Sequence, residues 1–418
     1  MKPILQLLVL SALLAAPAFA QSSQPVPMSD EQPAEAQIKP LRDKPLESFQ
    51  LKLLGLASQS AAAVPMQPHV KTRSRLQEAV GETQLRLGLL HSASTQFAAV
   101  ENWRSGTGFA DLAFECAADG QVEQAMRLLA LAEVALSETT KDQAQDWRGD
   151  RVRARMSRAL FALNMKEQAR VMAGEVESSE LGPALQERAR GFTREEGIAY
   201  LAEAEQIAKA GVFDQVQACL KICADLYGRF YADVELRTSL EERIRSAWNV
   251  MPVSIRVETI VSMSKGALEA GDQPSSRTLL DDAEGLLSKY EWKQIQDYLP
   301  LLAKVATQRA MVGNEVQAQE LIGLALAAYE KDAFRTADIY HARSLRPLAE
   351  SLAKMGDEKG ALVVYARVLK AGMSNPNSVP RTVDFVATCC SMAELAVEPN
   401  QELWDSLLKI SKGFSAPW

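Results

Sequence analysis

The chain has 418 residues, of which 47% are hydrophobic and 24% are charged, so it carries ample apolar surface for a core. This length allows two or three domains or one long repeat array. The formal net charge of −7 argues against nucleic-acid binding, because an acidic protein repels a phosphate backbone.

The first 20 residues have the features of a secretory signal peptide. Lys2 supplies a positive charge, and the apolar run Ile4 to Ala16 is about 13 residues long, too short for a bilayer span of about 20. Ala18-Phe19-Ala20 is a small-x-small cleavage site. We expect cleavage after Ala20 and a periplasmic or secreted protein. The alternative is an uncleaved anchor, and no later run is long and apolar enough to span a membrane.

Residues 21–45 are rich in Gln, Pro, Ser and Glu and are predicted to be a disordered linker. Residues 46–102 are predicted to form N-terminal helices, interrupted at Pro65 and Pro68. Their first apolar residues recur at helical spacing: Leu46, Phe49, Leu53 and Leu56.

Between residues 103 and 379 one pattern occurs six times. A small residue is followed seven positions later by Gly or Asn, five positions later by another small residue, and four later by a mostly apolar one. The Gly or Asn positions are Gly120, Asn164, Gly211, Gly271, Gly313 and Gly356. The small residues before them are Ala113, Ser157, Ala204, Ser264, Ala306 and Ala349. The residues after them are Ala125, Ala169, Val216, Ser276, Ala318 and Ala361.

This spacing predicts six helical hairpins. Two helices approach closely only where their side chains are small, and Gly or Asn supplies the left-handed residue that ends the first helix. Asp272 and Asp357 follow two of these glycines and are suited to cap the second helix.

The pattern resembles the tetratricopeptide-repeat superfamily over roughly residues 100 to 372. The resemblance implies an all-α fold, a TPR-like α-solenoid of antiparallel helical hairpins in a right-handed superhelix, with the first helix of each pair on the concave face. The turn residues are 42 to 60 positions apart, against about 34 in the standard repeat. The widest gap has room for an additional pair around Val234 to Trp248.

Two further features concern the ends of the array. Trp103-Arg104 and Trp147-Arg148 stand in the same register before Gly120 and Asn164, which indicates duplication. We expect the indoles to pack at the junction between units, with a ligand contact as the alternative. Residues 380–418 are predicted to form C-terminal capping helices.

The sequence shows no constellation for catalysis, a cofactor or a metal. The three histidines, His69, His91 and His341, stand apart. Five cysteines lie in apolar helical context and are expected to be buried thiols, with a disulfide or a metal site as the weaker alternatives: Cys116, Cys219, Cys223, Cys389 and Cys390. We therefore expect no enzyme activity and no cofactor.

One charged feature is a candidate binding site. Its members share a single helix stripe: Arg148, Arg151, Arg155 and Arg158. Arginine forks suit carboxylates and phosphates, so an anionic peptide or glycan is one interpretation. The other is a solvated stripe paired with acids from adjacent units.

These patterns favour an exported interaction scaffold that binds a partner protein or peptide, for which an anionic partner suits the stripe. One alternative is an envelope receptor for a glycan or small molecule. A less favoured alternative is a carbohydrate-active enzyme built as a helical toroid.

Overall fold

The structure is a computed structural model that describes residues 40–139, 146–176, 193–209, 213–414 and 418, all within the compact unit Lys39–Trp418. These residues are helical apart from their connections and one isolated β-bridge between Asp43 and Leu89. The prediction of an all-α protein is therefore confirmed for the described part of the chain. Within those ranges, no helix is both long and apolar enough to cross a bilayer.

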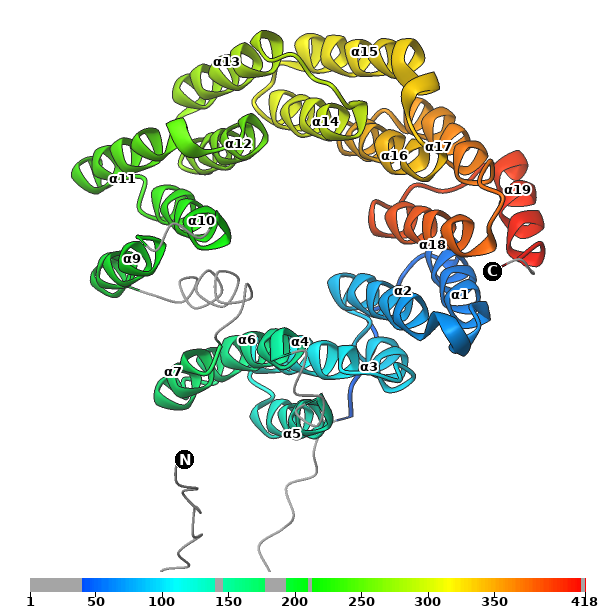
Figure 1. The fold of residues 1–418 in the computed structure, drawn as a ribbon, viewed down its shortest axis with the longest axis horizontal. Helices are drawn as coiled ribbons and strands as arrows, with labels where there is room; N and C mark the ends of the chain where they lie inside the picture. The colour runs from blue at the N-terminus through cyan, green and yellow to red at the C-terminus, as the bar shows by residue number, and fades with distance from the viewer. Residues whose placement is uncertain (1–39, 140–145, 177–192, 210–212, 415–417) are drawn as a thin grey trace, which may run out of the picture. The chain divides into compact units, whose positions relative to one another are not determined.

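Where the described residues are continuous, the helices follow one another with short connections (Figure 1). In the first half they are α1 (Ser48–Ala63), α2 (Met66–Arg86), α3 (Leu90–Ala98), α4 (Arg104–Ala118), α5 (Val122–Thr139), α6 (Asp146–Ala162), α7 (Lys166–Gly174) and α9 (Arg194–Ala208). In the second half they are α10 (Phe213–Arg229), α11 (Val234–Ala247), α12 (Val253–Glu269), α13 (Gln273–Lys289), α14 (Ile295–Met311), α15 (Glu315–Asp332), α16 (Asp338–Lys354), α17 (Glu358–Gly372), α18 (Ser378–Glu394) and α19 (Gln401–Lys412).

Five of the six predicted hairpin turns have the expected backbone conformation. Their turn residues have positive φ: Gly120 (73°), Asn164 (59°), Gly271 (84°), Gly313 (80°) and Gly356 (80°). This left-handed conformation favours Gly, with Asn the usual substitute, which explains the residue types. The sixth turn residue, Gly211, lies outside the described residues.

Side chains that follow two of these turns cap the next helix. Asp272 Oδ1 accepts from the backbone N–H of Ser275 at 3.0 Å, and Asp357 Oδ1 accepts from that of Gly360 at 2.9 Å. Each carboxylate satisfies an amide at a helix start that has no partner within the helix. The predicted role of the two aspartates is confirmed.

The small residues of the pattern lie where the two helices of a hairpin cross. Ala113, Ala125, Ala349 and Ala361 are fully buried. In the α12–α13 hairpin the hydroxyls of Ser264 and Ser276 are 2.8 Å apart. A larger side chain at such a crossing would push the helices apart.

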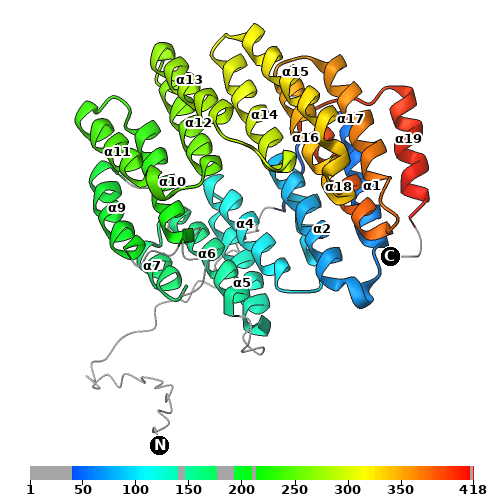
Figure 2. The same cartoon turned by 45° about the horizontal axis from the view of Figure 1, so that its top comes forward.

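The helices of this unit form two layers (Figures 1 and 2). In one layer α2 contacts α4, α4 contacts α6, and α10, α12, α14, α16 and α18 contact one another in turn. Between α6 and α10, an ion pair of 3.1 Å from Lys166 to Glu196 links α7 to α9. The series returns to its start, because α18 packs against both α1 and α2.

The contact between the first and last helices includes polar bonds. Gln50 Nε2 on α1 donates to the carbonyl oxygen of Ala393 on α18 at 2.7 Å, and both groups are buried. Arg86 at the end of α2 pairs with Glu394 at the end of α18 at 2.9 Å. The helices expected to cap a free end of the array are thus covered by the N-terminal helices, with α18 between α16 and α2.

Two segments differ in detail from the sequence-based expectations. Residues 40–45, assigned to the disordered linker, contact the α2–α3 turn: Lys44 N–H donates to Gly88 O at 3.1 Å, and Ser92 Oγ donates to Asp43 at 2.6 Å. In the widest gap, α11 and a 3₁₀ turn at Trp248–Val250 stand where an additional helix pair was expected. There Pro252 immediately precedes α12, which leaves no room for a second full helix.

Candidate functional site

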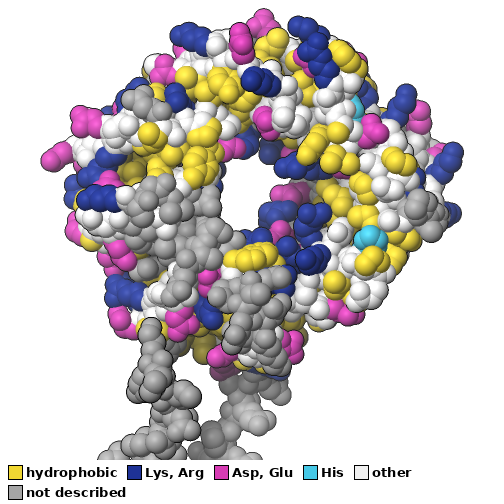
Figure 3. All heavy atoms as spheres, viewed as in Figure 1, with side chains coloured by type: hydrophobic (Ala, Val, Ile, Leu, Met, Phe, Trp, Pro, Cys, Tyr) yellow, Lys and Arg dark blue, Asp and Glu magenta, His cyan; other side chains and the backbone are white. Residues whose placement is uncertain are grey.

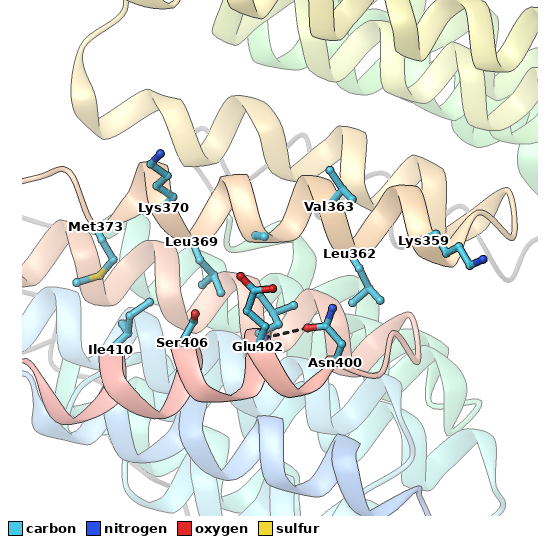
Figure 4. Close-up of a pocket in the computed structure, with 12 residues that line it drawn as sticks. Lys359, Leu362, Val363, Leu369, Lys370, Met373, Asn400, Glu402, Ser406 and Ile410 are labelled. Atoms are coloured by element: carbon cyan, nitrogen blue, oxygen red, sulfur yellow. Dashed lines mark hydrogen bonds between the residues drawn. The ribbon is translucent and has the colours of Figure 1, made fainter.

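A groove runs between α17 and α19 (Figure 4). Its volume is about 540 Å³, within the roughly 300–1,000 Å³ of typical ligand sites. α17 belongs to the last predicted hairpin and α19 to the C-terminal pair, so the groove joins residues about 40 positions apart.

Apolar side chains form the floor of the groove. Leu369 on α17 and Leu403 on α19 are buried beneath it, while Leu362 and Ile410 are half-buried. In Figure 4, Leu362 and Leu369 point from α17 toward α19. Val363, on the outer edge, is 63% exposed.

The rims of the groove are polar and differ in charge. Lys359 and Lys370 lie on the α17 side, and Glu402 with Ser406 lies on the α19 side (Figure 4). The two lysines are eleven residues apart on one helix, which places them about 16 Å apart along its axis. The α17 rim is therefore basic at both ends.

Local contacts fix the position of α19. Asn400 caps the helix, because its Oδ1 accepts from the N–H of Leu403 at 2.9 Å. Lys52 of α1 lies 3.9 Å from the ring centre of Trp404, and Phe414 contacts Phe385 of α18 edge-on with ring centres 5.4 Å apart. These contacts hold α19 on α1 and α18, and the side of α19 toward α17 stays open.

The arginine stripe of α6 faces α4. Arg155 Nη1 is 3.0 Å from Asp111 of α4, and Arg158 Nη1 is 3.8 Å from the same carboxylate. Asp111 is only 6% exposed, so the two arginines neutralise a buried acid.

Three of the stripe arginines also lie close to aromatic rings. The guanidinium of Arg158 lies 3.7 Å from the ring centre of Phe114, that of Arg151 lies 5.8 Å from that of Trp103, and that of Arg148 lies 5.7 Å from that of Trp147. All four arginines therefore have partners within the protein. Whether they also bind an external anion stays a prediction.

The duplicated Trp-Arg pairs meet each other. Trp103 and Trp147 pack edge to face with ring centres 5.4 Å apart, at the junction of α4 and α6. Trp103 is buried and Trp147 is 39% exposed. The expected packing of the two indoles between units is confirmed.

A second set of charges gathers where the first and last helices meet. Lys and Arg side chains group over α2 and α18 on the face shown in Figure 3. Acids stand next to them: Glu394 beside Arg86, and Glu350 beside Arg346 at 3.6 Å. Opposite charges alternate here, so this face is not a uniform anion-binding surface.

All five cysteines lie in the described part of the chain and are free thiols. Four are buried, and burial raises the pKa of Cys116 and Cys390 to about 11. Cys219 differs from the expectation because it is half-buried; a hydrogen bond from Cys223 lowers the pKa of its thiol. Among the described residues no cluster of His, Cys, Asp and Glu side chains is suited to hold a metal ion.

Sequence reasoning did not identify the groove. Its residues lie on two helices that no motif connects, and each helix by itself has an ordinary amphipathic pattern. A weak signal was available in Val363, an apolar residue on the polar side of α17. Comparison with models of known protein families gives no match, and a search of curated proteins finds no significant relative.

Proposed function

We propose that this protein is an exported interaction scaffold that holds an amphipathic helix of a partner protein in the α17–α19 groove. The hairpins with glycine turns support TPR-like repeat units, in a series whose last helices pack on its first. The N-terminal residues support export to the periplasm or the medium. The single observation that carries the proposal is the groove itself: two helices side by side with an apolar floor between them.

The dimensions of the groove suit a helix. An amphipathic helix in a groove buries its apolar face through residues at i, i+3, i+4 and i+7. The floor side chains Leu362 and Leu369 are seven residues apart on α17, so they repeat with the same period. The apolar residues of a partner helix in the groove would therefore contact the floor side chains of α17 at matching intervals.

The charges on the groove rims restrict the charge pattern expected of the partner helix. Lys359 and Lys370 flank the apolar floor on one rim. A partner helix with acidic side chains about three turns apart would pair with both lysines, while Glu402 on the other rim would repel a second acidic edge. The fitting occupant is an apolar helix with acids along one edge. Exposed pairs of this kind contribute about 0.2–1 kcal/mol each, so they select orientation more than affinity.

The arginine stripe adds no direct support to the proposal. Arg155 and Arg158 already neutralise Asp111, so an anionic partner would compete with a contact between α4 and α6. The enzyme alternative has no added support, because the acidic side chains described at the groove are limited to Glu402.

A site-specific crosslink in the native cell tests the groove. A photoreactive amino acid at Val363, which is 63% exposed, should trap a partner polypeptide, and peptide mapping should place the crosslink on an acidic-edged amphipathic helix. The matched control is the same probe at Val316 on α15, which is 76% exposed and lies outside the groove. Equal crosslinking from both positions would contradict the proposal.

A binding measurement then distinguishes the contribution of the apolar floor to affinity from that of the basic rim. The mapped helix, made as a peptide, should bind the full chain, and Leu362→Asp should weaken binding at least about tenfold because it places a charge in an apolar contact. Lys359→Glu with Lys370→Glu should weaken binding less, and mainly at low salt. If Leu362→Asp binds the peptide as tightly as the native protein, the helix docks elsewhere.

Export has its own measurement. N-terminal sequencing of protein recovered outside the cytoplasm should begin at Gln21. Recovery of a chain that still begins at Met1 would contradict cleavage after Ala20.

A further inference from the structure

Two hollows are lined by residues of the connection between α13 and α14. One, of about 480 Å³, reaches the start of α12, and the other, of about 560 Å³, reaches the start of α16. They share Trp292, Lys293, Gln294 and Gln296. The shared residues make the two hollows neighbouring subsites divided by one short segment.

Aromatic rings form a fixed wall here. Trp292 stacks on Tyr298 with ring centres 5.3 Å apart and an interplanar angle of 22°, and Tyr290 meets Trp292 edge-on at 4.8 Å. The indole N–H of Trp292 donates to the carbonyl of Leu287 at 3.0 Å, which fixes the ring. Tyr290 remains 51% exposed, and Tyr340 lines the second hollow. A ligand in either hollow would meet an aromatic side chain.

The polar side chains around these rings are mostly neutral or balanced in charge. Gln294 is exposed and Gln296 is half-buried, and Gln296 Nε2 donates to Gln294 Oε1 at 2.7 Å. In the first hollow Glu258 forms an ion pair with Lys304. In the second, Asp332 and Arg335 form a weak ion pair of 3.7 Å.

One base and two acids complete the set: Lys293, which lines both hollows, Asp297 in the first and Glu291 in the second. Lys293 and Asp297 are both exposed, carry opposite charges and line the first hollow. The lining as a whole therefore selects neither a strong anion nor a strong cation. It offers both hydrogen-bond donors and acceptors beside flat apolar faces.

We infer that these paired hollows bind a neutral oligosaccharide. A pyranose ring presents a face of C–H groups that packs on the negative face of an aromatic ring. Its hydroxyls each donate and accept, as do the amides of Gln294 and Gln296. Two hollows on either side of Trp292 would accommodate neighbouring sugar units.

A proline-rich peptide is the competing class, because such peptides also dock in aromatic grooves. The carbonyls of a polyproline helix only accept hydrogen bonds, and the N–H of Trp292 is already donated to Leu287. Asp297 and Glu291 add acceptors to the lining, which match the hydroxyls of a sugar and not the carbonyls of a proline-rich chain. The chemistry therefore favours the saccharide.

This site is separate from the α17–α19 groove, and its test does not depend on the partner helix. The probes are three neutral oligosaccharides: cellotetraose, maltotetraose and the tetramer of N-acetylglucosamine. Calorimetry and tryptophan fluorescence on the full chain should show at least one of them binding with a Kd below about 1 mM. Binding should be little changed by salt, since no ion pair forms.

Variants assign the binding to the aromatic wall. Tyr290→Ala should weaken it about tenfold, and Tyr290→Phe should retain most of it because the ring remains. Gln294→Ala should weaken binding to a smaller extent. The matched control is Phe213→Ala on α10, another exposed aromatic (45%) away from the hollows, which should leave affinity unchanged.

Three results would overturn the inference. The first is that none of the three oligosaccharides binds. The second is equal affinity in Tyr290→Ala and Phe213→Ala. The third is a decaproline peptide that binds at this site, as judged by loss of its binding in Tyr290→Ala, while the sugars do not.

Discussion

Two junctions between neighbouring helices of the same layer each bury an aspartate, and they treat it differently. At the α4–α6 junction, Asp111 is 6% exposed and contacts Arg155 at 3.0 Å and Arg158 at 3.8 Å. At the α16–α18 junction, Asp384 is 7% exposed, and none of the ion pairs or side-chain hydrogen bonds found between described residues involves its carboxylate. The two carboxylates are buried to a similar extent, but ion pairs with arginines are found for Asp111 and not for Asp384.

The surroundings of Asp384 show the consequence. Burial raises the pKa of this carboxyl from 3.8 to about 6, although Arg346 and Arg343 act in the opposite direction. The side chain fits because Gly372 of α17 has no side chain; a Cβ atom there would lie 3.0 Å from the Cβ of Asp384. A buried acid therefore stabilises one junction through its arginines and weakens the other when it is ionised.

The largest effect is expected from removing the paired acid. Asp111→Ala should lower the free energy of unfolding by about 3 kcal/mol, because it leaves two largely buried arginines without their acid. Urea unfolding followed by circular dichroism measures this change. A loss below about 1 kcal/mol would show that the arginines are well solvated without Asp111, and the stripe would then be available for an external anion.

Overpacking the hairpin crossings should have a similar effect near both junctions. Ala125→Leu on α5 and Ala361→Leu on α17 each place a larger side chain at a fully buried position and should cost about 1–3 kcal/mol. Thermal melting of both variants gives the comparison. Equal losses would show that the two regions pack alike and that the aspartates differ through charge alone. An unchanged melt for either variant would mean that its crossing is misplaced.

The smallest effect, with the opposite sign, is expected at the unpaired acid. Because the folded pKa of Asp384 is raised, the unfolded chain releases this proton first, so its contribution to stability falls as the pH rises from about 4 to about 6 and is constant above that. Asp384→Asn should remove this dependence. The shift in pKa corresponds to about 3 kcal/mol at pH 7, and burial of the asparagine amide offsets about 2 kcal/mol of it, so we expect the free energy of unfolding to rise by about 1 kcal/mol.

Urea unfolding at pH 4, 5, 6 and 7 measures the pH dependence of the free energy of unfolding in the native protein and in Asp384→Asn. The matched control is Asp111→Asn. The control should lose stability at pH 7 where Asp384→Asn gains it. If both amides destabilise the protein equally, Asp384 has a charged partner and the contrast between the junctions fails.

Local patterns in the sequence were sufficient for the hairpins. The left-handed turns at Gly120, Asn164, Gly271, Gly313 and Gly356 and the small residues at the crossings depend on neighbours within about 20 positions. The caps at Asp272 and Asp357 depend on neighbours within three. Such features follow from backbone sterics and side-chain volume, which are properties of the residue type.

The candidate sites required the folded chain. The sequence showed the stripe at Arg155 and Arg158, but the contact with Asp111 joins residues 44 positions apart. The groove joins Leu362 to Leu403, and the contact of α1 with α18 joins Gln50 to Ala393 across 343 positions. No local pattern encodes these pairings.

The sequence by itself determined that the described chain is helical, where its hairpins turn and which residues cap them, because hydrogen bonding and volume at short range decide these features. The tertiary structure alone decided which buried acid has a partner, which helix faces stay uncovered and how the first and last helices meet. These depend on long-range packing, in which a side chain's electrostatic environment is set by residues distant in sequence.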